Sequence, residues 1–271
     1  KLAENYNLLI NHETLRQKMI GAGLWSSKQR KVKHRQWRER KACLGELVQL
    51  DGSPHQWLEN RAPSCTLLAF IDDATSKIGW LAFVDEEATI PTMEATKSYL
   101  KKDGRPLELY VDRGKVFKVN LNNPDEERIT QYRRALDELG IKVTYARSPQ
   151  AKGRIERLFG TLQDRLVKEL RLAGINTLKE ANHYAQTVYL PKHNQKFAVE
   201  PKQSTNLHRS IEGYQLEEIL NLQEERILTN DFTLRYHNQW FQLNAKQPTL
   251  VFPKNTITVI RYLDGTIKLK L

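Results

Sequence analysis

Two short apolar runs of this chain each end in an aspartate, and a third acid follows on a predicted helix. Asp51 ends the run at residues 47–51, Asp112 ends the run at residues 107–112, and Glu156 lies one turn into an amphipathic segment. A carboxylate at the end of a buried strand is costly unless something neutralises it. Three such acids can together hold two divalent cations about 4 Å apart, an arrangement that drives in-line displacement at phosphorus.

The order of the predicted elements limits the fold. We expect, in sequence, strands at residues 45–51, 66–72 and 78–84, a helix at 90–101, a strand at 107–112, a helix at 123–139 and a strand at 141–146. Three consecutive strands followed by alternating helix and strand are typical of an α/β protein. They indicate a mixed sheet that is covered by helices on both faces.

The next predicted helix, at residues 151–172, has two distinct faces. Its apolar stripe consists of Ile155, Leu158, Phe159, Leu162, Leu166 and Leu170. Glu156 lies off that stripe, on a face with Gly153 and Gly160, where each glycine costs about 1 kcal/mol of helix stability. These small residues either let a nucleic-acid backbone approach the carboxylate or let the helix pack closely on the sheet.

The last third of the chain changes character. We expect helices at residues 177–190, broken by Pro191, and at 212–225. Short strands then follow at 232–236, 239–243, 256–261 and 266–271. The Asp264-Gly265 pair between the last two is a strong hairpin signal. Strands this short and this closely spaced predict a small β-barrel.

Four motifs occur in an order that is specific to one family. They are Leu50-Asp51-Gly52-Ser53, Phe70-Ile71-Asp72-Asp73-Ala74-Thr75-Ser76, Val111-Asp112-Arg113-Gly114 and Ser148-Pro149-Gln150-Ala151-Lys152-Gly153-Arg154-Ile155-Glu156-Arg157. With them the chain resembles DDE transposases of bacterial insertion sequences, which have a catalytic core of the retroviral-integrase type. The segment His193-Asn194-Gln195-Lys196-Phe197-Ala198 with Pro201 adds to the resemblance, which spans roughly residues 40–205.

The resemblance implies a domain plan. Residues 1–43 would hold the end of a helix-turn-helix region, with a helix at 11–22, and a basic DNA-binding linker. Residues 44–205 would form a ribonuclease-H-like catalytic domain, a five-stranded mixed sheet flanked by helices. Residues 206–225 would be a helical connector, and residues 226–271 a small C-terminal β-barrel.

The resemblance also implies an activity, that of a transposase and polynucleotidyl transferase. DNA would be cleaved at the transposon ends, and the freed 3′-OH would attack target DNA by two-metal-ion phosphoryl transfer. Asp51, Asp112 and Glu156 would be both the catalytic residues and the metal ligands, with Asp51 bridging two Mg²⁺ ions. Oxygen ligands with open water positions suit this hard cation, and Mn²⁺ should substitute for it.

DNA is the expected partner because the net charge of +11 is concentrated in one segment. Residues 27–41 hold eight lysines and arginines against a single glutamate, a density that usually tracks phosphates. The DNA-binding residues expected are Lys28, Arg30, Lys31, Lys33, Arg35, Arg38 and Arg40 in this run, and Gln150, Lys152, Arg154 and Arg157 around Glu156. A solvated basic linker is the alternative for the run.

Several other residues stay open or have ordinary explanations. Asp72 and Asp73 suit a turn better than a metal site. The two residues His55 and Trp57 belong either near the active site or in a packed loop. The pair at 193–194 suits either the site or a helix cap.

Composition excludes some classes of protein. The mean hydropathy is −0.62 and the longest apolar stretch, residues 65–71, is far too short to span a membrane. Cys43 and Cys65 have no metal-ligand spacing, so we expect reduced thiols. With no signal peptide visible, we expect a cytoplasmic, nucleoid-associated bacterial protein. The chain does not begin with Met and is expected to be a fragment or a processed product.

Two alternatives compete with the transposase interpretation. One is a ribonuclease-H-like DNA nuclease or resolvase, in which a fourth carboxylate or another order of acids is usual. The other is a domesticated DNA-binding protein that has lost catalysis, against which the presence of all three acids counts. By analogy with the family, we expect a homo-oligomer, a dimer or a tetramer, on paired DNA ends.

Overall fold

A computed structural model describes residues 2, 6–26, 39–112, 130–146 and 153–271. The contacts divide the chain into two units, residues 1–38 and residues 39–271. In the first unit, α2 (His12–Gly21) matches the helix expected at residues 11–22. The side chain of Asn11 caps it by accepting a hydrogen bond from the backbone N–H of Glu13 at 2.9 Å. Its membership of a helix-turn-helix domain stays a prediction.

The second unit is built on the expected five-stranded mixed sheet. Its strands, in spatial order, are β4 (Ile78–Val84), β3 (Cys65–Asp72), β2 (Leu47–His55), β5 (Glu108–Val111) and β6 (Lys142–Tyr145). The β4, β3 and β2 strands pair antiparallel, whereas β2, β5 and β6 pair parallel. This order confirms the ribonuclease-H-like sheet.

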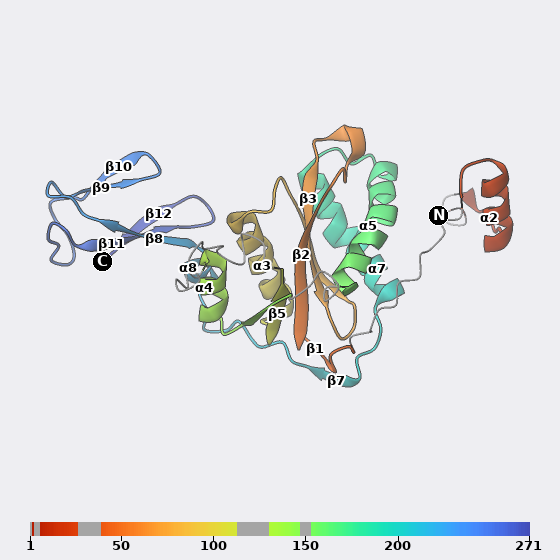
Figure 1. The fold of residues 1–271 in the computed structure, drawn as a ribbon, viewed down its shortest axis with the longest axis horizontal. Helices are drawn as coiled ribbons and strands as arrows, with labels where there is room; N and C mark the ends of the chain where they lie inside the picture. Colours follow the sequence, from red (N-terminus) through yellow and green to blue (C-terminus); the bar gives the residue numbers. More distant parts are fainter. Residues whose placement is uncertain (1, 3–5, 27–38, 113–129, 147–152) are drawn as a thin grey trace. The chain divides into compact units, whose positions relative to one another are not determined.

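Helices cover both faces of the sheet (Figure 1). On one face α3 (Thr89–Asp103) and α4 (Gln131–Glu138) bury Val48, Leu50, Leu109 and Val111 in one core cluster. On the other, α5 (Gly153–Leu172) packs its apolar stripe on β3 and β4, with α6 (Leu178–Tyr184) and α7 (Leu190–Phe197) beside it. Because both faces are buried, the strands read as continuous apolar runs rather than as alternating patterns.

Amide side chains close the exposed edge of β4. Asn194 exchanges two hydrogen bonds with the backbone of Ile78, at 2.8 and 2.9 Å, and Asn182 does the same with Phe83 at 2.7 and 2.9 Å. Gln186 donates to the carbonyl of Leu81 between them. An edge strand bonded in this way cannot template pairing with another chain.

The helix expected to break at Pro191 does not break there, and that prediction was wrong. The chain passes from α6 through a π-helical turn (Ala185–Tyr189) directly into α7, where Pro191 occupies the first turn. Pro191 has no N–H to donate, and the π turn before it, in which the Leu190 N–H bonds the Ala185 carbonyl five residues back, carries the helix past the proline. The π turn changes the register of the helix, and Gln186, inside that turn, is one of the residues that meets β4.

Other boundaries differ in smaller ways. Helix α4 begins at Gln131, capped by the Thr130 hydroxyl, and residues 123–129 of the expected helix lie outside the described residues. A short parallel pair of β1 (Cys43–Leu44) and β7 (Gln203–Asn206) was not predicted, nor was the 3-10 turn Glu59–Arg61. Two-residue and fully polar strands leave no periodic signal in a sequence.

The C-terminal region is β-rich, but the helix expected at residues 212–225 was wrong. Only α8 (Leu216–Ile219) is helical, and Leu222–Ile227 forms strand β8. Strand β11 (Thr256–Arg261) pairs antiparallel with β8 and with β12 (Ile267–Lys270), while β9 (Thr233–Tyr236) and β10 (Gln239–Gln242) form a separate hairpin. The two sheets enclose a small core of Leu228, Leu234, Tyr236, Ile257 and Val259.

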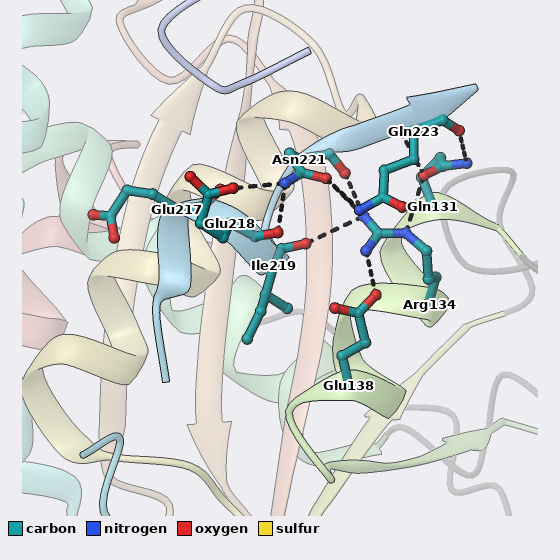
Figure 2. Close-up of polar contacts among 8 residues, drawn as sticks. All are labelled: Gln131, Arg134, Glu138, Glu217, Glu218, Ile219, Asn221 and Gln223. Atoms are coloured by element: carbon teal, nitrogen blue, oxygen red, sulfur yellow. Dashed lines mark hydrogen bonds and ion pairs between the residues drawn. The ribbon is translucent and has the colours of Figure 1, made fainter. Parts of the chain in front are cut away.

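Arg134 of α4 joins the unit built on the five-stranded sheet to β8 (Figure 2). Its guanidinium donates to the carbonyl oxygens of Ile219 and Asn221, at 3.1 and 2.6 Å, and to Glu138. Gln131 and Gln223 add two further bonds, at 2.7 and 3.0 Å. These contacts explain why residues 220–223 leave the helix, since their backbone groups are bonded to α4 instead.

Candidate active site

The register of two neighbouring strands brings Asp51 and Asp112 together. Strands β2 and β5 are parallel, and Gln49 pairs with Tyr110. Two residues further along each strand comes an aspartate, and neighbouring strands lie about 4.8 Å apart. Because side chains alternate between faces, both aspartates point away from the α3 and α4 layer. Each is partly buried.

Two hydrogen bonds fix α5 along the same face of β2. The carbonyl of the Gln49 side chain accepts from the backbone N–H of Ile155 at 3.3 Å, and Gln163 donates to the Ser53 hydroxyl at 3.3 Å. Asp51 lies midway between Gln49 and Ser53 on β2 and shares their face. Helix α5 therefore runs past Asp51, with the turn that carries Glu156 at the Gln49 end.

Glu156 and Gly160 are exposed, and this decides between two explanations of the glycines. A Cβ atom added at Gly153 or Gly160 would meet no atom within 4 Å among the described residues. Close packing of the helix on the sheet is therefore not the reason for glycine at these positions. The open surface beside Glu156 is available for the approach of a large ligand.

The three acids do not form a finished metal site as they stand. Among the described residues, no group of three histidine, cysteine, aspartate or glutamate side chains converges closely enough to hold an ion. One Asp51 oxygen accepts from the backbone N–H of Gly52 at 3.1 Å. The donor set, three carboxylates with two of them on adjacent strands, fits the oxygen ligands that a hard divalent cation prefers.

A buried polar cluster that sequence patterns did not reveal holds the site together. Asp73 is fully buried; it accepts from the Gln49 amide at 2.8 Å, lies 3.2 Å from the Arg154 guanidinium and accepts from the Lys41 N–H at 2.9 Å. Gln49 is also fully buried and bonds the start of α5. The Gln49, Asp73 and Arg154 cluster therefore fixes the strand of Asp51 against the helix of Glu156.

Asp72 has a different structural task. Its carboxylate accepts from the N–H and the hydroxyl of Thr75, both at 2.7 Å, and from the N–H of Gly45 at 2.9 Å. The turn prediction therefore holds for Asp72. For Asp73 it is incomplete, because only a contact distant in sequence, with Arg154, identifies its role.

The structure places the remaining candidate residues as follows. Trp57 is fully buried, donates to the Ser53 carbonyl at 2.9 Å and packs edge-on against His55, so it belongs to the core. Asn194 bonds β4, and His193 is buried between Tyr189 and Phe197. The side chain of Arg154 is only 10% exposed, whereas Arg157 is exposed and donates to the Gly153 carbonyl at 2.9 Å.

Most of the DNA-binding candidates lie in the basic run or just before α5, where the structure describes few residues. Lys28, Arg30, Lys31, Lys33, Arg35, Arg38, Gln150 and Lys152 lie outside the described residues. Arg40 is described, and its guanidinium donates to the Ser76 hydroxyl at 2.8 Å and to the Ala74 carbonyl at 3.2 Å. It therefore lies against the β3–β4 turn.

Two curated proteins are similar to the chain along most or all of its length. The protein y4bF of Sinorhizobium fredii, which is named as a transposase, is 39% identical over 273 residues, covering 100% of this chain and 60% of its own length. The transposase for insertion sequence IS1202 of Streptococcus pneumoniae is 32% identical, covering 86% of this chain and 50% of its own length. The chain thus spans only 50 to 60% of the relatives it matches.

Solved integrase structures are also similar, at low sequence identity. The catalytic core domain of HTLV-2 integrase in complex with magnesium is 19% identical, covers 63% of this chain and 100% of its own, and has a TM-score of 0.45. A simian T-cell lymphotropic virus intasome in complex with a PP2A regulatory subunit is 15% identical, covers 99% and 94%, and has a TM-score of 0.49. No family model matches the chain.

The sheet order and the two transposase relatives confirm the resemblance to the integrase and transposase superfamily. The fold is that of an integrase-type core followed by a β-rich region. Within the part of the chain that the structure describes, every helix is too short or too polar to cross a membrane.

Proposed function

We propose that this chain is the catalytic part of a DDE transposase that cleaves DNA at the ends of its element and transfers the 3′-OH to target DNA. The observation that supports it most is the register of β2 and β5, which sets Asp51 beside Asp112 under the helix of Glu156. The similarity to two transposases supports the same reaction class.

Asp51, Asp112 and Glu156 would hold two Mg²⁺ ions, with Mn²⁺ able to substitute. When bound, such ions activate the attacking oxygen, stabilise the leaving oxygen and neutralise phosphate charge. The chain's own contribution is positioning. The two aspartates are set by backbone pairing, and Glu156 is set by the Gln49, Asp73 and Arg154 cluster. Residues fixed on strands and a helix in this way can hold a site more precisely than residues on loops.

DNA contacts would come from the basic run and from the start of α5. We propose Lys28, Arg30, Lys31, Lys33, Arg35, Arg38 and Arg40 as residues that follow the phosphate backbone, with Gln150, Lys152 and Arg157 nearer the reacting end. The open surface at Gly160 supports approach of the duplex to Glu156. A dimer or a tetramer on paired DNA ends is the working form that we propose.

A strand-transfer assay tests this function. The protein is incubated with pre-cleaved ends of its own element and a supercoiled plasmid, in Mg²⁺, Mn²⁺ or Ca²⁺, beside the variant Glu156→Gln. We expect joined products with Mg²⁺ and Mn²⁺ for the unchanged chain and none for the variant. Asp137→Asn, an exposed carboxylate of α4 on the other face of the sheet, is the matched control and should join DNA normally.

Other outcomes separate the alternatives. Nicking without joining would favour a nuclease or resolvase. Firm DNA binding with no product under any of the metal conditions would favour a DNA-binding protein without catalysis. Joined products from Glu156→Gln at the normal rate would exclude the assigned role of Glu156.

A further inference from the structure

A small pocket lies beside the first two turns of α5, away from the acidic face. Its volume is about 180 Å³, and Arg40, Ser76, Arg154, Arg157, Thr161 and His193 contribute to its wall. An α-helix has about 3.6 residues per turn, so residues 154, 157 and 161 share one face of α5. The face that holds residues 156, 160 and 163 is centred about 125° away around the helix. The pocket is therefore separate from the candidate metal site.

The wall of the pocket is strongly cationic. Three arginines line it, and no aspartate or glutamate does. Asp73, behind the wall, offsets the charge of Arg154 at 3.2 Å. Arg40 uses one guanidinium nitrogen, Nη1, for its bonds to the Asp73 and Ala74 carbonyls and the Ser76 hydroxyl. Arg40 is exposed, and these bonds hold its planar fork at the mouth of the pocket.

His193 adds an observation that points to a ligand. Its side chain is 94% buried, since only 6% is exposed, and its Nδ1 has no hydrogen-bond partner in the described part of the chain. A buried polar atom without a partner is costly and calls for an explanation. Burial, with the nearby Arg165 adding to it, lowers the pKa of His193 to about 4, so the neutral ring offers one N–H donor.

We propose that this pocket binds one phosphate group of the DNA backbone, an inference that rests on the proposed DNA-processing function. Guanidinium forks, hydroxyls and an imidazole N–H together match the several acceptor oxygens of a phosphate. Arg40 belongs to the basic run at residues 27–41, so a strand that follows this run arrives at the pocket. The backbone would then be held on one side of α5 while its scissile region reaches the other.

Binding of a short DNA duplex, measured without divalent metal, tests the pocket separately from catalysis. Arg157→Gln, and in a second variant Arg40→Gln, should each weaken binding by about tenfold and reduce the salt slope by about one. Arg171→Gln is the matched control, because Arg171 is an exposed α5 arginine that pairs with Glu59 outside the pocket. Binding equal to that of the control in both variants would overturn the proposal.

A second measurement observes the pocket directly. Imidazole resonances of His193, assigned by comparison with His193→Gln, should shift with inorganic phosphate and with the duplex. A shift with phosphate but none with duplex would assign the pocket to free phosphate and overturn the DNA proposal. A duplex that binds without moving His193 would also overturn it, while leaving the strand-transfer test untouched. Loss of strand transfer with both binding results intact would instead count against the proposed function.

Discussion

The two faces of α5 differ in how their charged residues are held. Glu156 and Gly160 lie on an open face and are exposed, whereas Arg154 on the other side is nearly buried against Asp73. Glu156, the residue proposed as a metal ligand, is thus exposed to solvent. Its position is set by its neighbours in the helix: Arg154 pairs with Asp73, and the Ile155 N–H bonds the Gln49 side chain. This division leaves the acid free to bind an ion while the helix stays rigid.

The largest effect on strand transfer should come from removing a proposed metal ligand. We expect Asp51→Asn to reduce strand transfer by about a thousandfold, because a metal ligand supports several kcal/mol of transition-state stabilisation. Its folding stability should be unchanged or higher, since a partly buried charge is removed. Product formation is measured on gels and stability by urea unfolding. A variant that loses both together would mean that Asp51 has a structural role.

Removing Asp73 from the buried cluster should mainly lower the free energy of unfolding. Asp73→Ala leaves Arg154 as a buried charge without its carboxylate, which we expect to cost about 3–5 kcal/mol of unfolding free energy. Asp137→Ala, which removes the exposed α4 pair with Arg133, is the control and should cost less than about 0.5 kcal/mol. Equal losses in urea unfolding would refute the role given to the buried cluster.

Protonation of His193 should make the folded protein less stable at acidic pH. Its folded pKa of about 4 lies below the ordinary value of 6.5, so between these pH values the unfolded chain binds a proton that the folded chain does not. Stability should therefore be complete above pH 6.5 and fall as the pH drops toward 4, by about 1–2 kcal/mol at about pH 5.

The charge of Arg165 on α5 also opposes protonation of the ring and so adds to the lowering of its pKa by burial. Urea unfolding at about pH 7 and about pH 5 should show a smaller decrease for His193→Gln than for the unchanged chain. An identical decrease in both proteins would assign the acid sensitivity to other groups.

The smallest effect is expected for Gly160→Ala, a substitution that tests whether DNA approaches the exposed face of α5. Alanine has room at this position and favours helix, so we expect unfolding free energy to rise by about 1 kcal/mol. If DNA approaches here, duplex binding or strand transfer should weaken despite the added stability. A stabler protein with unchanged DNA binding and joining would mean that the surface beside Glu156 is not used.

Some of the site was predictable because its signals are local. The apolar runs before Asp51 and Asp112 and the stripe of α5 are periodic patterns that need no partner to be seen. They were enough to place three acids on the right elements. The β8 segment shows the opposite case: its residues suit a helix, but bonds from Arg134 and pairing with β11 hold it extended. Tertiary contacts overrode a weak local preference.

The sequence by itself determined the five strands of the mixed sheet and helix α5, because each depends on a pattern of side chains within a few residues of one another. Only the tertiary structure decided that Gln49 and Asp73 brace α5, that His193 is buried at a cationic pocket, and that Gly160 faces open space. The two hydrogen bonds of Gln49, for example, join it to residues 24 and 106 positions away in the sequence. Such pairings depend on strand register and on which faces meet, and neither is written in any one segment.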